Sequence, residues 1–116
     1  MDLEIQGSLR DVSDILTELG FEVIVKKEKL EAKLKQRGGK FHVLGAQLKD
    51  GVIYLDVHWD AHLHLLFIGV DYQAKPRKIC EAIIERAAQK GLKAEIIGGT
   101  NWFNRRNKAI LKGLKI

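Results

Sequence analysis

Cysteine and long apolar runs are scarce in this 116-residue chain, and each scarcity excludes a class of protein. Cys80 is the only cysteine, so no disulfide can form within the chain, as is typical of a reducing compartment. The densest apolar run, residues 63–70, is interrupted by His64 and is too short to span a bilayer. The start, Met1 to Glu4, is acidic and lacks the basic and then apolar build of a signal peptide. We therefore expect a cytoplasmic protein without a membrane partner.

Acidic residues are missing from the last part of the sequence. All 15 of them lie at or before Glu95, whereas the 20 basic residues continue to Lys115. Residues 1–99 therefore carry 15 charges of each sign, and the whole formal excess of +5 lies in residues 100–116. A neutral body with a basic end favours a polyanionic partner.

The overall composition is typical of one folded domain. Hydrophobic residues make up 46% of the chain and charged residues 30%, which excludes a disordered protein. A length of 116 residues allows one core and not two, so we expect a single domain over residues 1–116. Lys and Glu are abundant while Cys and Met each occur once, a bias that favours a thermophilic source.

Two helical patterns are separated by a long stretch with strand periodicity. Ser8, with Asp11 three residues later, predicts the start of a helix that ends at Gly20. Pro76 predicts the start of a second helix, which ends at Gly91. From residue 21 to 70 apolar residues alternate with polar ones, which predicts an antiparallel meander.

Short strands at Leu3–Ile5 and Leu92–Ile97 complete the pattern. We therefore expect an α+β fold in which helices cover one face of a largely antiparallel sheet, followed by a basic C-terminal helix. A ferredoxin-like βαββαβ plan with an extended central meander would build it.

The two tight turns of the meander, Gly38–Gly39 and Asp50–Gly51, predict conflicting registers. Pairing across the first turn places Phe41 and Val43 on the core face. Pairing across the second places Leu44, Ala46 and Leu48 there instead. Both registers fit one core only if the strand slips, and a bulge at Gly45 would provide the slip.

The last residues form a cationic amphipathic pattern. At 100° per residue most of the basic side chains fall on one side of the expected helix, with Trp102 among them and apolar residues opposite. Clustered cations release counterions when they neutralise phosphates, and a tryptophan can stack on an unpaired base. These residues are our nucleic-acid-binding candidates: Trp102, Arg105, Arg106, Lys108, Lys112 and Lys115. The alternatives are a surface helix with no partner and a helix that docks on a membrane surface or another protein.

Three of the four histidines lie close together between His58 and His64. A hairpin with the loop Asp60-Ala61-His62 places His58 opposite His64 and leaves the other face of the strand uniformly apolar. The candidate metal ligands are His58, His62, His64 and Asp56, a set that suits zinc or manganese. Histidines that serve only as polar groups on a sheet surface are the alternative.

The sequence His62-Leu63-His64 resembles the His-hydrophobe-His strand motif of the HUH endonucleases, which include rolling-circle replication initiators and single-strand transposases. The resemblance implies a ferredoxin-like core and a divalent ion that is held by the two histidines and polarises a scissile phosphate. The family's nucleophilic tyrosine follows the motif on a helix. This chain departs from that pattern, because Tyr72, the one tyrosine after the motif, follows His64 by eight residues at an expected strand end and would be an unusual nucleophile. The resemblance therefore implies His62 and His64 as catalytic metal ligands, with Tyr72 as the remaining candidate for the nucleophile.

The leading expectation is a small protein that binds DNA or RNA through the basic C-terminal helix. The first alternative is a metal-dependent nuclease or phosphodiesterase built on the histidine hairpin. The second is a module for homo-oligomerisation or protein interaction without catalytic activity. The sequence favours neither DNA over RNA nor single over double strands.

Overall fold

The computed structural model describes residues 1–48, 51–61 and 74–98 of the chain. Six strands and two helices lie along the described residues. They are β1 (Asp2–Gln6), α1 (Leu9–Glu18), β2 (Glu22–Lys26), β3 (Lys29–Gln36), β4 (Gly39–Gln47), β5 (Val52–Ala61), α2 (Ala74–Gln89) and β6 (Ala94–Gly98). No helix within the described residues is long and apolar enough to cross a lipid bilayer.

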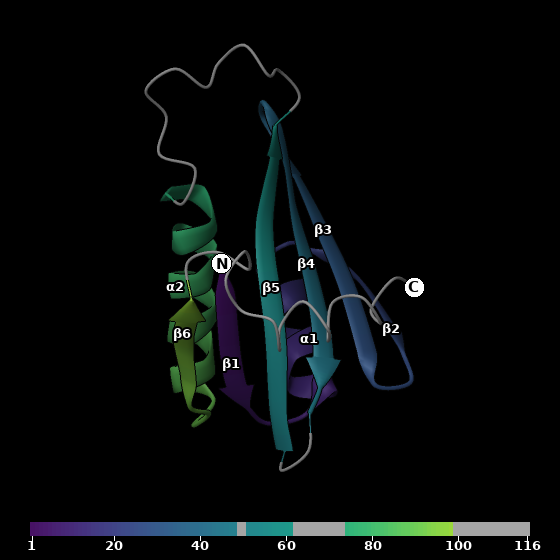
Figure 1. Ribbon diagram of the computed structural model, residues 1–116, viewed down its shortest axis with the longest axis vertical. Coiled ribbons are helices and arrows are strands. Elements are labelled where there is room, and N and C mark those ends of the chain that lie inside the picture. Colours follow the sequence, from purple (N-terminus) through teal and green to yellow (C-terminus); the bar gives the residue numbers. More distant parts are fainter. Residues whose placement is uncertain (49–50, 62–73, 99–116) are drawn as a thin grey trace.

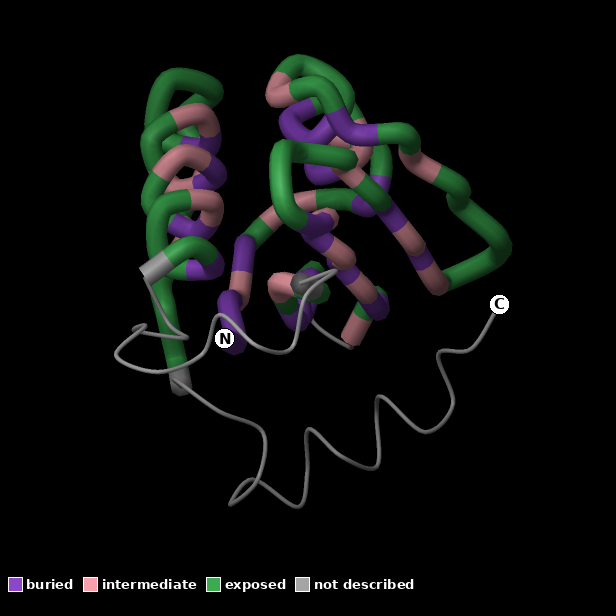
Figure 2. Tube along the Cα trace, turned by 90° about the horizontal axis from the view of Figure 1, so that it is seen from above, coloured by how far each residue is buried: buried purple, intermediate pink, exposed green. Residues whose placement is uncertain are grey.

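The strands form one sheet in the order β2-β3-β4-β5-β1-β6, and every neighbouring pair is antiparallel (Figure 1). Both helices lie on the same side of this sheet, as the view along the strands makes clear (Figure 2). The sequence-based expectation of an α+β fold with an antiparallel sheet is therefore confirmed. The basic helix expected over residues 100–116 lies outside the described residues.

Helix α1 begins where the sequence predicted because Ser8 caps it. The Ser8 hydroxyl accepts a hydrogen bond from the Asp11 amide at 3.1 Å, and the Ser8 amide donates one to the Asp11 carboxylate at 3.0 Å. Gly20, with φ of +96°, follows the last turn and lets the chain reverse toward β2. The buried stripe of α1 consists of Leu9, Val12, Ile15 and Leu16.

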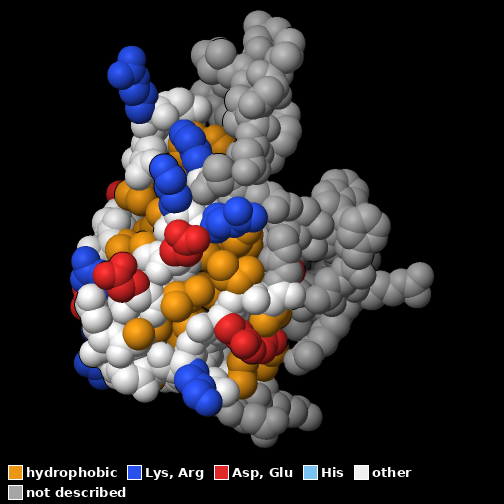
Figure 3. Space-filling model, turned by 90° about the vertical axis from the view of Figure 1, so that its left-hand side faces the viewer, with side chains coloured by type: hydrophobic (Ala, Val, Ile, Leu, Met, Phe, Trp, Pro, Cys, Tyr) orange, Lys and Arg blue, Asp and Glu red, His pale blue; other side chains and the backbone are white. Residues whose placement is uncertain are grey.

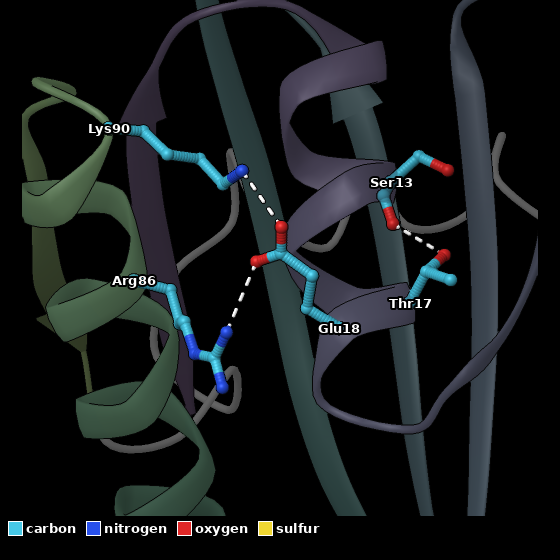
Figure 4. Close-up of polar contacts among 5 residues, drawn as sticks. All are labelled: Ser13, Thr17, Glu18, Arg86 and Lys90. Atoms are coloured by element: carbon cyan, nitrogen blue, oxygen red, sulfur yellow. Dashed lines mark hydrogen bonds and ion pairs between the residues drawn. The ribbon is translucent and has the colours of Figure 1, made fainter.

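Helices α1 and α2 are joined by an apolar layer and by polar contacts at its rim (Figure 4). Cys80, Ile83 and Ala87 of α2 are fully buried against the sheet and α1. Glu18 of α1 accepts hydrogen bonds from Lys90 at 2.9 Å and from Arg86 at 3.3 Å. The hydrogen bond from Lys90 is the main cause that lowers the pKa of Glu18 below its usual value.

Strand β5 separates apolar from polar side chains as its alternation predicted. Ile53, Leu55 and Val57 are fully buried beneath the helices, and Trp59 packs at the rim of the same core. Tyr54, Asp56 and His58 point to the opposite side. We call it the open face because neither described helix lies on it, although Tyr54 and Asp56 are fully buried there.

The expected bulge at Gly45 is wrong. The β4 ladder runs without a slip, with Phe41 opposite Trp59, Val43 opposite Val57 and Gly45 opposite Leu55. Leu44 and Ala46 therefore lie on the open face and do not compete for the core. Gly45 serves another purpose, because a Cβ atom there would lie 2.8 Å from Cδ2 of Leu55. The missing side chain makes room for a buried leucine.

Candidate nucleic-acid interface

Basic side chains gather at one end of the sheet, where the β3–β4 hairpin turns and α2 begins. Lys35 lies directly opposite Lys40 in the β3–β4 ladder, and Arg37 lies in the turn between them. Figure 3 shows Lys and Arg side chains at the upper end of the molecule on the side of α2. We call six residues of this region the cationic end: Lys35, Arg37, Lys40, Lys75, Arg77 and Lys78.

Trp59 joins the hairpin to the start of α2. The Lys75 ammonium lies 3.8 Å from the centre of the Trp59 ring, a cation–π contact. On the neighbouring strand the Phe41 ring lies 4.7 Å from the Trp59 ring, centre to centre. Gly39 makes this possible, because a Cβ atom there would come within 2.6 Å of the Trp59 ring. The expected Gly38–Gly39 turn therefore lies one residue earlier, at Arg37–Gly38, and Gly39 belongs to β4.

The charge of the cationic end is only partly balanced by nearby acidic residues, such as Glu81 one helical turn after Arg77. Five of its side chains are exposed and Lys40 is half-buried. In the described part of the chain none of the six forms an ion pair, although Asp60 lies opposite Lys40 in the β4–β5 ladder. Like charges directly opposite one another, such as Lys35 and Lys40, destabilise a sheet. An anionic ligand would relieve this repulsion.

The three cations at the start of α2 add to the same effect. No acidic residue lies in the first turn of this helix. Cations near a helix N-terminus meet the positive end of the helix dipole, which is unfavourable in the free protein. The amides of that first turn attract anions instead. Both the side chains and the helix end therefore favour a negatively charged partner.

A pair of histidines lies next to the cationic end on the open face. His42 of β4 is directly opposite His58 of β5, and we call the two the histidine pair. The His58 imidazole contacts the buried Asp56 carboxylate through Nε2. His42 Nε2 lies 3.5 Å from Oε2 of Glu31, whose other oxygen is 3.5 Å from the Lys33 ammonium. Of the two, only His58 is in close contact with a carboxylate; among the described residues the buried His42 Nε2 forms no hydrogen bond, although Glu31 lies near it. A carboxylate in contact with an imidazole can orient the ring, as in sites of general acid–base chemistry.

A buried polar cluster lies beside the histidine pair at the start of β1. The Tyr54 hydroxyl donates a hydrogen bond to the Asp2 carboxylate at 2.7 Å. Burial, with the Asp2 carboxylate as the second cause, raises the pKa of Tyr54 far above its usual value. The Met1 amine donates to the Val57 carbonyl at 2.8 Å and lies 3.9 Å from Oδ1 of Asp56. Tyr54 therefore remains protonated and acts as a hydrogen-bond donor, not as a nucleophile.

Only some of the site residues expected from the sequence lie within the described residues. Of the expected metal ligands, His58 and Asp56 are in contact, whereas His62 and His64 lie outside the described residues. Within residues 1–48, 51–61 and 74–98, no three His, Cys, Asp or Glu side chains come together as a metal-ligand group. The other candidates outside the described residues are Tyr72, Trp102, Arg105, Arg106, Lys108, Lys112 and Lys115.

The expected loop of the histidine hairpin is misplaced. Asp60 and Ala61 were expected in the loop, but both belong to β5, where Ala61 pairs with Gly39. From Val52 to Asp56 the other edge of β5 is taken by β1. Along that stretch β5 therefore lies between β1 and β4.

Two groups of residues that the structure brings near one another were not identified from the sequence. His42 was not connected with His58, although the alternation on both strands places each of them on the open face. The cations of α2 were not connected with the basic hairpin, because nothing local relates residues 75–78 to residues 35–40. The Trp59–Lys75 contact is a tertiary feature and has no sequence signature.

Comparison with known proteins gives no relative from which a role could be transferred: no protein-family model matches the chain, and no significant match is found among curated proteins.

Proposed function

We propose that the protein binds nucleic acid through a cationic surface. The cationic end supports the proposal: six basic side chains from two separate segments lie at the same end of the sheet, and none has an ion-pair partner among the described residues. Each phosphate that such a group neutralises releases counterions, which drives association with DNA or RNA.

The basic residues at the C-terminus extend the proposal. Residues 100–116 carry five cations and no acid. We propose that they form an amphipathic helix whose polar side holds phosphates through Arg105, Lys108, Lys112 and Lys115. Trp102 would stack on an unpaired base, a contact worth about 1–3 kcal/mol per base.

The fold we propose for this function is the ferredoxin-like plan with two strands added. If β3 and β4 are left out of the strand order, the remaining order is β2-β5-β1-β6. This order, with a helix after the first strand and another before the last, is that of a βαββαβ unit. The inserted β3–β4 hairpin is the element that carries three of the six residues of the cationic end.

Salt-dependent binding tests the proposal. Labelled single-stranded and duplex DNA and RNA are titrated with protein, and binding is followed by fluorescence anisotropy at several salt concentrations. The test variant is Lys35→Glu with Lys78→Glu. The first substitution places a carboxylate opposite Lys40 and the second places one near the start of α2, so the fold is expected to keep its stability. Affinity at low salt should fall about 10-fold or more, and the salt slope should become shallower by about 1–2.

The matched control is Arg10→Glu with Lys93→Glu. It changes the formal charge by the same amount at exposed positions in the first turn of α1 and just before β6, away from the cationic end. Wild-type affinity is expected for this control. Equal losses in both double variants would mean that only net charge matters, and unchanged binding in the test variant would remove the cationic end from the interface.

Phosphodiester cleavage is the second candidate function. The histidine pair favours it, because two imidazoles flanked by carboxylates lie close to Lys40 along the same ladder. The metal-dependent form of the proposal adds His62 and His64 as ligands of zinc or manganese. Labelled strands are incubated with and without these ions, using wild type, His58→Ala and His62→Ala. Cleavage lost in both variants supports the metal site, whereas intact strands in every arm exclude nuclease activity.

A further inference from the structure

Strand β2 forms one edge of the sheet and exposes apolar side chains. Among the described strands, β2 has a single neighbour, β3. Ile24 is 52% exposed and Val25 is 44% exposed, which is more than any other large hydrophobic residue in the described part of the chain. An edge strand also presents unpaired backbone N–H and C=O groups that can pair with another strand. Natural sheets usually protect such an edge, and the centre of β2 carries no charged residue.

Strand β2 has the sequence Glu22-Val23-Ile24-Val25-Lys26. Its end charges are complementary when two copies of the strand lie antiparallel. It begins with an acid and ends with a base at equal distances from its centre. We propose that β2 pairs antiparallel with β2 of a second copy of this chain, about a two-fold axis through Ile24. The inference is independent of nucleic-acid binding, because β2 contributes no residue to the cationic end.

The proposed register satisfies both charge and burial. Glu22 lies opposite Lys26 of the second copy, and the reverse pair repeats on the other side of the axis. Ile24 lies opposite its own counterpart, and Val23 lies opposite Val25. Because a two-fold axis perpendicular to the sheet keeps the faces aligned, Val25 would extend the helix-covered core of each copy. Opposite charges directly across a ladder stabilise it, and apolar pairs do the same.

The contacts within one copy also favour an incoming acid. In the β2–β3 ladder Glu22 lies opposite Lys33, a favourable pair, whereas Lys26 lies opposite Lys29. A glutamate supplied by a second copy would come to lie beside Lys26. The same contacts make Lys26→Glu an informative substitution, since it turns a like-charge pair within the copy into an opposite-charge pair.

The other edge of the sheet does not offer this match. Pairing of β6 with itself about Ile96 would place Glu95 opposite Ile97 and would form no charge pair. Pairing of β2 with β6 would be head-to-tail and would extend into a chain of copies instead of closing as a dimer. The self-complementary charge pattern therefore selects β2 with β2.

Sedimentation of full-length protein from low micromolar to near-millimolar concentration tests the inference. Pairing through one short strand gives a small interface, so a dimer in the micromolar range or weaker is expected. Lys26→Glu and Glu22→Lys should each shift the protein to monomer, and the double exchange Glu22→Lys with Lys26→Glu should restore the dimer. Lys93→Glu, just before β6, should leave the dimer intact. Circular dichroism confirms that each variant is folded.

Cysteine cross-linking tests the register. Residues directly opposite in a ladder have Cα atoms about 4.5–5.5 Å apart, within disulfide range. Oxidised Ile24→Cys should therefore form a covalent dimer, whereas Val25→Cys should not, because its counterpart lies about 7–8 Å away on the diagonal. A wild type that stays monomeric at every concentration, single reversals that remain dimeric, or species that keep growing with concentration would each overturn the inference.

Discussion

Gly45 of β4 lies directly opposite Leu55 of β5. Substitutions at these two positions test the register of the β4–β5 ladder in the middle of the sheet. Leu55 is fully buried, and its Cδ2 occupies the space that a Cβ atom at Gly45 would need, 2.8 Å away. Gly45→Ala adds that Cβ atom to a packed core. Overpacking of this kind costs about 1–3 kcal/mol, while alanine in place of a strand glycine returns about 0.5–1 kcal/mol. The net cost expected for Gly45→Ala is about 1 kcal/mol.

Leu55→Ala removes the side chain that occupies this space. A fully buried leucine replaced by alanine costs about 2–5 kcal/mol, because the lost transfer free energy is joined by the cost of a cavity. In that background Gly45→Ala no longer meets Leu55 and fills part of the cavity. The second substitution should therefore stabilise the Leu55→Ala protein by about 0.5–1 kcal/mol, the opposite sign from its effect in the wild type.

Urea denaturation of wild type, both single variants and the double variant measures all four free energies of unfolding. The double variant should be more stable than Leu55→Ala alone. Additive effects, with Gly45→Ala costing the same in both backgrounds, would show that these two residues are not in contact. Such a result would reject the continuous β4–β5 ladder and reinstate a slip at Gly45.

Other contacts give further predictions. Because Lys90 holds the pKa of Glu18 below its usual value of 4.5, the melting temperature of the wild type should exceed that of Glu18→Gln at pH 7, and the difference should shrink as the pH falls below 4.5; a difference that does not shrink on acidification would contradict this linkage. Burial raises the pKa of the Cys80 thiol to about 11, so a thiol reagent at pH 8 should label folded protein far more slowly than denatured protein, and equal rates would show that the thiol is accessible. Tyr54→Phe removes the hydrogen bond to Asp2 and should lower the free energy of unfolding by about 1–3 kcal/mol, whereas an unchanged urea midpoint would mean that this bond adds no stability.

Local periodicity was enough to predict the helices and the side-chain alternation of the strands. The pair Ser8 and Asp11 fixed the start of α1 because a capping box depends only on neighbouring residues. The stripe around Cys80 and Ile83 identified α2 for the same reason, since helical spacing alone selects its buried face. In both cases the physical cause lies within a few residues.

The neighbours of β5 could not be predicted in this way. Hairpin reasoning pairs β5 with the segments just before and just after it, and it therefore placed His64 opposite His58. In the structure β1 returns from the start of the chain and pairs with β5 from Val52 to Asp56. Such long-range pairing is stabilised by the shared core under the helices, which no local pattern encodes. On its other edge β5 pairs with β4, which places His42 opposite His58, while His64 lies outside the described residues.

Formal charge balance over residues 1–99 also hides how the charges are distributed. Asp2 and Asp56 are fully buried, the first hydrogen-bonded to Tyr54 and the second in contact with His58, so neither presents its charge to solvent. The residues of the cationic end, in contrast, are exposed or half-buried and unpaired within the described chain. Folding therefore buries two carboxylates, one of them near the Met1 amine, while the basic side chains of the cationic end stay at the surface. A body that is neutral by residue count is basic at one end, and attraction of a polyanion does not depend on the C-terminal residues alone.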